Sequence, residues 1–139
     1  DENGNPVAPK ILRRKPRVQV SEYGDSSFTL GEVYIKSPLL LFPTFALIWK
    51  VNSLDDISME SLMAVELYNP KIEILIVGIG KKGTKISQNL YTETKRLGIG
   101  VDFMDTPSAL TTFNVLNNEM RNIAAALLPA GWPNKPNAQ

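Results

Sequence analysis

Three glycines and two lysines near the middle of the chain form the pattern that could most readily do chemistry. Gly78, Gly80 and Gly83 have the spacing Gly-x-Gly-x-x-Gly, and Lys81 and Lys82 lie between the second and third glycines. In dinucleotide-binding proteins this spacing lets the backbone approach a pyrophosphate at the start of a helix. Because exposed backbone amides and nearby lysines attract anions, this loop is a candidate for binding phosphate or a nucleotide.

The same glycines also have a simpler interpretation as a structural turn. Residues 72–77 are rich in branched apolar side chains and predict a buried strand, after which glycine permits a sharp turn into a helix. Asp102 or Asp105 lies about where a ribose-binding acid is expected, but a dinucleotide site normally lies between two βαβαβ halves, and this chain has about one. The lysines would also crowd a pyrophosphate. We favour the structural turn and keep anion binding as the alternative.

Two missing residue types restrict the remaining chemistry. The chain contains no cysteine and no histidine, which removes thiolate nucleophiles, the commonest general base and the commonest ligands of transition metals. Asp55, Asp56 and Glu60 are acidic, but acids beside a helix start usually interact with the helix dipole. We therefore expect no catalytic residues, no metal site and no cofactor, and we interpret the protein as not an enzyme.

The charge balance argues against a general attraction to nucleic acid or to anionic membranes. Fifteen basic and fourteen acidic residues give a net charge of +1. Basic residues gather only near the N-terminus, where they include Arg13 and Arg14. This cluster fits either a solvated arm or docking onto an acidic or phosphate-rich surface. An RNA-associated role would rest on residues 10–17 alone and is weakly supported.

Short apolar runs and turn residues predict the elements that must hold the glycine loop. Residues 18–51 predict an antiparallel meander, with Gly31 in a hairpin turn. Ser58 is a plausible N-cap for a short helix that has Met59, Leu62, Met63, Glu66 and Leu67 on one face.

The pattern after the glycine loop is more regular. Residues 86–97 have apolar side chains at helical spacing, and Gly98 would end that helix in a left-handed conformation. Residues 99–104 predict a second buried strand, and Thr106 as N-cap with Pro107 at the first position predicts another helix. Residues 123–128 fit either a helix or a strand. The sequence thus predicts an α/β domain with a mixed central sheet.

The two ends differ in composition from the middle. We expect an extended basic and proline-containing arm over residues 1–17, a single domain over residues 18–129 and a flexible tail over residues 130–139. The longest apolar stretch, residues 39–49, contains Pro43 and is too short to span a membrane. Since the chain starts at Asp1 rather than methionine, we expect that any targeting segment is not present in this chain.

The strand and turn at residues 72–80 resemble those of the complex I assembly factor 3 family. The similarity continues through residues 97–106 and 112–119 to residues 124–129, and it covers about residues 18–129. Two positions depart from the family. Ile79 stands where the family usually has threonine, and residues 118–120 replace a Glu-Gly pair that relatives tend to carry.

This resemblance implies a single α/β domain in which the mixed sheet is flanked by helices and residues 123–128 form a strand. The N-terminal antiparallel meander is then followed by a β-α-β-α-β half. The family also has bacterial and archaeal relatives of unknown function, and no cofactor or catalytic activity is established for it.

The resemblance further implies a mitochondrial protein on the matrix side of the inner membrane. It would act on early matrix-arm intermediates of complex I with a second assembly factor, or be retained as an accessory component of a large mitochondrial complex. Membrane association would occur only through partners. The residues that we expect to contact partners are Arg13, Arg14, Asn114, Asn117 and Asn118. The alternative is a small-ligand protein that binds phosphate or nucleotide at Gly78, Gly80, Lys81, Lys82 and Gly83.

Overall fold

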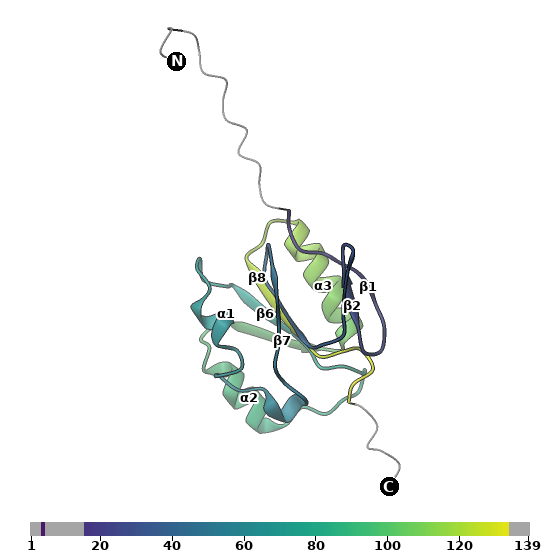
Figure 1. The fold of residues 1–139 in the computed structure, drawn as a ribbon. Coiled ribbons are helices and arrows are strands. Elements are labelled where there is room, and N and C mark those ends of the chain that lie inside the picture. Colours follow the sequence, from purple (N-terminus) through teal and green to yellow (C-terminus); the bar gives the residue numbers. More distant parts are fainter. Residues whose placement is uncertain (1–3, 5–15, 134–139) are drawn as a thin grey trace.

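A mixed sheet runs through the middle of the molecule (Figure 1), and the glycine loop follows the carboxyl end of its interior strand β6. The computed structural model describes Gly4 and residues 16–133. The strand order is β5-β4-β8-β6-β7. Strands β8, β6 and β7 are parallel, whereas β4 pairs antiparallel with both β8 and β5. The bounds are Leu39–Leu41 for β4, Ala46–Ile48 for β5, Ile74–Gly78 for β6, Gly100–Met104 for β7 and Ile123–Leu127 for β8.

The two central strands are apolar along their length because helices or strands cover both faces of the sheet. In β8 all five residues are buried, and its three alanines leave room for close packing on either side. Ala124 and Ala126 face one core, whereas Ala125 faces the other. The strand interpretation of residues 123–128 is therefore confirmed over Ile123–Leu127.

The N-terminal strands form a second, smaller sheet. Strands β1 (Val20–Tyr23), β2 (Phe28–Leu30) and β3 (Val33–Ile35) pair antiparallel in the order β1-β2-β3. Gly31 has a φ of +62° in the turn between β2 and β3, as the hairpin spacing predicts. The predicted meander is therefore antiparallel throughout but divided, since only β4 and β5 join the main sheet.

Helices lie on both faces of the main sheet (Figure 1). On one face, α3 (Thr106–Asn118) packs with the small sheet around Phe28 and Phe113. On the other face lie α1 (Met63–Leu67), α2 (Gln88–Lys95) and the short 3₁₀ helix η1 (Leu54–Asp56), packed around Phe42 and Leu62. The expected fold class, a single α/β domain with a mixed sheet flanked by helices, is confirmed.

Three local predictions need correction. Helix α3 has Asp105 rather than Thr106 as its N-cap, because the Asp105 carboxylate accepts the Ser108 N–H at 3.0 Å. Helix α1 begins at Met63 and not near Ser58, which instead closes a preceding turn. The strand at residues 99–104, predicted to be buried, is the edge strand β7, since it pairs only with β6.

Across residue 4 and residues 16–133, none of the helices has both the length and the apolar character needed to cross a membrane.

Candidate functional site

The glycine loop, residues 78–83, begins at the carboxyl end of the central strand β6. Gly78 pairs in register with Met104 at the end of β7 and with Leu127 at the end of β8. Three parallel strands therefore end together beside the loop. In open α/β sheets this edge is where ligands commonly bind, so the location fits a site.

Three consecutive backbone amides of the loop are nevertheless used inside the protein. The three amides after Gly78 each donate to a protein acceptor: the Met104 carbonyl for Ile79 (2.9 Å), the Thr106 hydroxyl for Gly80 (2.8 Å) and the Trp132 carbonyl for Lys81 (2.6 Å). The following helix, α2, starts only at Gln88, so the loop does not lead directly into a helix N-terminus. Anion binding by the loop stays a prediction, with less physical support than the motif alone indicated.

Close packing explains two of the three glycines. A Cβ atom on Gly80 would collide with the carbonyl oxygen of Trp132, and one on Gly78 would lie 2.9 Å from the Thr106 hydroxyl oxygen. Gly83 has a φ of +85° but no atom near the position of a Cβ. The motif therefore lets the segment after β8 cross directly over the loop. That segment falls in the tail expected over residues 130–139, yet Gly131 donates to the Asp25 carbonyl at 2.8 Å.

Thr106 joins the loop, α3 and the end of β8. It is fully buried, and its hydroxyl accepts the Gly80 N–H and donates to the Leu128 carbonyl at 2.6 Å. Its own N–H donates to the Gly80 carbonyl at 2.9 Å. Sequence reasoning assigned Thr106 to capping and missed this role, because the partners lie more than twenty residues away in either direction.

Asp105 takes the capping role. The Ser108 N–H holds the pKa of the Asp105 carboxyl below its ordinary value, and the Ser108 hydroxyl and the charge of Lys82 act in the same direction, whereas burial opposes them. The helix is therefore capped by an ionised carboxylate directly beside the glycine loop.

Two of the expected contact residues hold the N-terminal segment in place. Asn114 and Val20 exchange two hydrogen bonds of 3.0 Å, as two paired strand residues would. Asn117 is fully buried and donates to the Val18 carbonyl at 2.9 Å and the Pro43 carbonyl at 3.1 Å. These amide side chains thus complete the backbone hydrogen bonding of the chain that leads into β1, and Asn117 is not accessible to a partner in this conformation.

Asn118 is exposed at the end of α3, whereas Arg13 and Arg14 lie outside the described residues. The neighbouring Arg17 donates to the carbonyl oxygens of Asn117 and Arg121 at 2.8 Å and so lies at the C-terminal end of α3. The glycine loop contacts the opposite, N-terminal end of this helix through Thr106. Among the described contact candidates, Asn117 and Asn118 therefore do not form a single site with the loop.

A different group of side chains presents apolar surface to solvent. Phe45, Leu47, Met63 and Leu67 have exposed fractions of 42%, 41%, 49% and 73%, and we call them the β5–α1 surface. The sequence pattern placed Met63 and Leu67 on the same helical face as Leu62. In the structure Leu62, just before α1, and Val65 within it are buried, whereas Met63 and Leu67 are exposed.

Contacts at both ends of α1 place it beside the edge strand β5. The Trp49 indole N–H donates to the Ser61 carbonyl at 3.0 Å before the helix, and the rings of Phe45 and Tyr68 lie 6.1 Å apart after it. Leu47 lies opposite Leu40 in the sheet and therefore shares its face, on which α1 packs. Clusters of exposed apolar side chains of this kind often mark protein interfaces.

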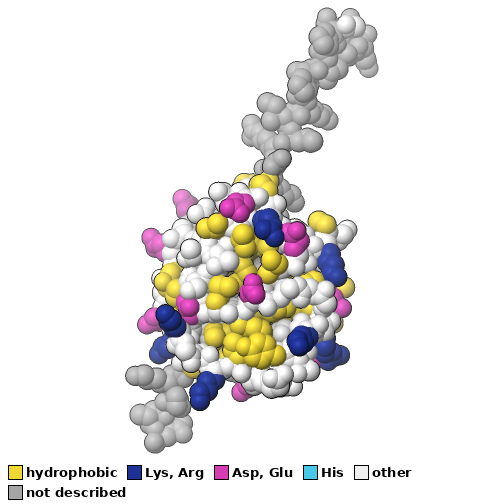
Figure 2. Space-filling model, turned by 180° about the vertical axis from the view of Figure 1, so that it is seen from behind, with side chains coloured by type: hydrophobic (Ala, Val, Ile, Leu, Met, Phe, Trp, Pro, Cys, Tyr) yellow, Lys and Arg dark blue, Asp and Glu magenta, His cyan; other side chains and the backbone are white. Residues whose placement is uncertain are grey.

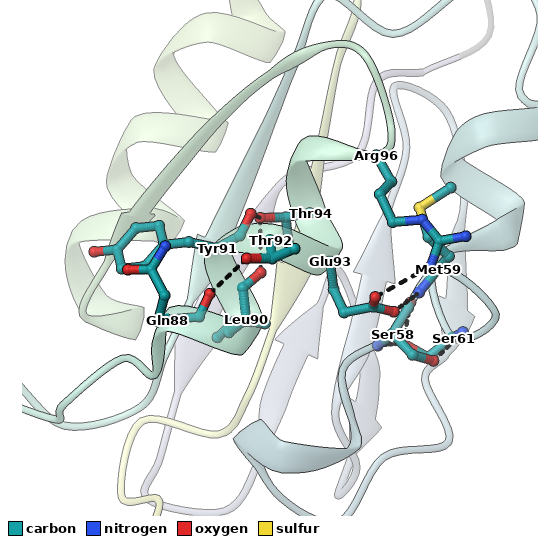
Figure 3. A network of polar contacts seen from close by, with 10 residues as sticks. All are labelled: Ser58, Met59, Ser61, Gln88, Leu90, Tyr91, Thr92, Glu93, Thr94 and Arg96. Carbon is teal, nitrogen blue, oxygen red and sulfur yellow. Dashed lines mark hydrogen bonds and ion pairs between the residues drawn. The ribbon is translucent and has the colours of Figure 1, made fainter.

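A polar network fixes the turn that leads into α1 (Figure 3). The Glu93 carboxylate on α2 accepts the Met59 N–H at 3.3 Å and pairs with Arg96 at 3.2 Å. Within the turn, Ser58 and Ser61 exchange backbone-to-hydroxyl hydrogen bonds of 2.9 and 3.2 Å. Helix α2 thus positions one half of the β5–α1 surface.

The face opposite to that seen in Figure 1 has a mixed character. Figure 2 shows apolar side chains gathered near its middle, with acidic and basic side chains interspersed around them. Within the described part of the chain, no three acidic side chains come close enough together to hold a metal ion. The most distinctive features of the described surface are therefore apolar.

Comparisons with known proteins agree with the resemblance seen in the sequence. A family model described as a protein of unknown function (DUF498/DUF598) matches residues 20–128. A Danio rerio protein named NADH dehydrogenase (ubiquinone) 1 alpha subcomplex assembly factor 3 is 37% identical over 110 residues, which are 79% of this chain and 63% of that protein. The chain thus spans less than two thirds of this relative's length.

Bacterial proteins match over more of their own length. An uncharacterized protein of Rhodobacter capsulatus is 28% identical over 123 residues, covering 88% of this chain and 94% of that protein. The crystal structure of a Bordetella parapertussis protein superimposes with a TM-score of 0.69 at 29% identity, covering 81% of this chain and 96% of that one. This chain therefore shares its fold with a bacterial protein of known structure.

Proposed function

This chain belongs to the DUF498/DUF598 family, and from this premise we propose that it is a non-catalytic protein-interaction factor that helps to assemble respiratory complex I. The observation that carries the proposal is the 37% identity to a relative named as a complex I assembly factor. The absence of cysteine and histidine from the sequence supports a role in binding rather than catalysis.

The finer parts of the proposal follow from the same premise. The protein acts in mitochondria, on the matrix side of the inner membrane, and binds early matrix-arm intermediates together with a second assembly factor. Residues 18–129 form the interacting domain, and the family match to residues 20–128 supports this unit. Alternatively, the protein does not dissociate after assembly and is retained as an accessory component of the finished complex.

We propose the β5–α1 surface as the place where a protein subunit docks. Interface cores are enriched in aromatic residues and methionine, and this surface presents Phe45 and Met63 beside Leu47 and Leu67. Strand β5 is also an edge of the main sheet, so its outer backbone groups can accept a further strand. The occupant that fits these features is an apolar segment of a partner protein.

Affinity purification tests this proposal directly. The tagged chain, fused to a mitochondrial targeting segment, is expressed in cells, and the proteins recovered with it are identified by mass spectrometry and native gels. We expect complex I subunits and a second assembly factor with the unmodified chain, and at least a threefold lower recovery with Leu67→Ser, because burying an exposed leucine at an interface contributes about 1 kcal/mol.

Tyr34→Ser provides the matched control. Tyr34 is 65% exposed on β3, in the small sheet that packs on the opposite face of the main sheet from α1, and its replacement removes a comparable side chain. We expect recovery with this variant to match the unmodified chain. Equal losses with both variants would contradict docking at the β5–α1 surface, and recovery of no complex I subunit with the unmodified chain would contradict the assembly role itself.

A further inference from the structure

A cavity of about 380 Å³ lies beside the glycine loop, and neither Lys81 nor Lys82 lines it. Its apolar lining comes from the ends of the two central strands, where Ile79 and Leu128 are buried, and from the half-buried ring of Trp132. Two surface segments, residues 52–55 and 84–87, complete its walls. The volume lies in the range of sites that bind small molecules.

The glycine motif builds this cavity. Because Gly80 has no side chain, the Trp132 carbonyl can approach the loop and accept the Lys81 N–H at 2.6 Å. The Trp132 N–H in turn donates to the Pro129 carbonyl at 3.0 Å, which fixes the turn after β8. The indole of Trp132 is thereby held as a wall beside the carboxyl ends of β6 and β8.

The polar groups at the rim differ in charge between the two surface segments. Lys85 contributes an exposed cation beside the hydroxyls of Thr84 and Ser87, whereas Asp55 contributes an exposed carboxylate from the other segment. The Ser87 hydroxyl accepts the Leu90 N–H at 3.2 Å and keeps its own proton free to donate. An anionic group on a ligand would therefore bind at the Lys85 side of the cavity.

We propose that this cavity binds a small carboxylate with a flat apolar body. The apolar body packs against Ile79, Leu128 and the Trp132 ring, and the carboxylate binds Lys85 and the Ser87 hydroxyl. A doubly charged phosphate fits less well, because Asp55 lines the same cavity and the amides of Ile79, Gly80 and Lys81 already donate to protein acceptors. This site is separate from the proposed docking surface, and either proposal can fail without the other.

Protein NMR can test the site with 2-naphthoate, a flat aromatic carboxylate. The chain has two tryptophans, so an ¹⁵N-labelled sample gives two indole N–H signals, and Trp132→Phe assigns them. The Trp49 indole is buried and donates to the Ser61 carbonyl, and it serves as the internal reference. We expect a saturable shift of the Trp132 signal and a constant Trp49 signal.

Charge variants separate the proposed contact from general attraction. Lys85→Gln should weaken 2-naphthoate binding about twofold to fivefold, as expected for a solvent-exposed ion pair. Lys82→Gln should leave it unchanged, because Lys82 lies in the glycine loop and does not line the cavity. The neutral 2-naphthamide should bind the unmodified chain about as weakly as 2-naphthoate binds the Lys85→Gln variant.

Three results would overturn the proposal. The first is no saturable shift of the Trp132 signal up to about 5 mM 2-naphthoate, a concentration above any useful affinity. The second is an equal effect of Lys85→Gln and Lys82→Gln. The third is tighter binding of 2-naphthyl phosphate than of 2-naphthoate, which would assign the cavity to phosphorylated ligands instead.

Discussion

Gly80 has a φ of +89° and lies against the carbonyl oxygen of Trp132, so two separate constraints act on it. The first is the left-handed backbone, which disfavours any residue with a Cβ atom. The second is the segment that crosses the loop. Gly83 has a nearly equal φ of +85° but open space around it, so only the first constraint applies there. A comparison of substitutions at Gly80 and Gly83 can therefore distinguish the effect of backbone strain from the effect of close packing.

Alanine substitutions at these two glycines should have unequal effects. Gly83→Ala should lower the free energy of unfolding by about 1 kcal/mol, the usual effect of a left-handed non-glycine residue. Gly80→Ala should lower it by about 3 kcal/mol, because the Trp132 backbone must also move and the Lys81 N–H loses its acceptor. Urea denaturation measures both values. Equal losses of unfolding free energy in the two variants would show that the backbone at Trp132 can move away from residue 80 at no energetic cost.

The ionised Asp105 carboxylate makes the start of α3 sensitive to acid. Its pKa is lower in the folded protein than in the unfolded chain, so its stabilising effect is complete above the unfolded pKa and is lost as the pH falls through the folded one. Asp105→Asn keeps a capping side chain that does not titrate. As the pH falls below the ordinary aspartate pKa of 3.8, the free energy of unfolding should therefore fall more steeply in the unmodified chain than in the variant. Parallel curves from urea denaturation would contradict this.

At the scale of secondary-structure elements, the sequence pattern correctly predicted the turns and strands that depend on residues close together in the chain. The hairpin at Gly31, the left-handed Gly98 after α2 and the central strand β6 follow from turn residues and apolar runs, and all three are present, although α2 already ends at Lys95. The division of the meander into two sheets was not predictable, because it depends on the pairing of β4 with β8, more than eighty residues later in the chain.

The candidate site was predicted less well than the fold for the same reason. The glycine motif identified the correct loop, but its meaning depends on Thr106 and Trp132, which approach it from distant parts of the chain. The outward side of α1 was missed because apolar spacing does not show which residues of a short helix meet the sheet. Asparagine at positions 114 and 117 indicated a polar function, and the structure shows that their partner is the chain's own backbone.

Glu93 should control the order of the turn before α1, because it is the acceptor for the Met59 N–H (Figure 3). Glu93→Ala should speed hydrogen exchange at Met59 and lower the free energy of unfolding by about 1 kcal/mol. Arg96→Gln is the control, since it removes the ion pair but leaves the Glu93 acceptor in place. The Arg96 side chain is 62% exposed, so we expect an effect below about 0.5 kcal/mol. If both variants accelerate exchange equally, the ion pair and not the hydrogen bond orders the turn.

At the scale of the whole molecule, the cavity, the basic residue Arg17 and the β5–α1 surface lie in three different places. The cavity lies at the carboxyl ends of the parallel strands, Arg17 lies at the C-terminal end of α3, and the β5–α1 surface lies along the opposite sheet edge from β7. A partner could therefore dock in two different ways. Docking at the β5–α1 surface would rest on apolar contacts, whereas docking through the basic segment would rest on electrostatic attraction.

Salt distinguishes these two geometries. Apolar contacts change little with ionic strength, whereas attraction by exposed arginines is largely screened once the Debye length falls to a few ångströms. With a net charge of +1 the whole chain adds no long-range field that would obscure the difference. If partners dock at the β5–α1 surface, recovery in affinity purification should change less than about twofold between 0.1 and 0.5 M NaCl. A steep loss that is reproduced at low salt by replacing Arg13 and Arg14 with glutamine would instead assign docking to the basic segment.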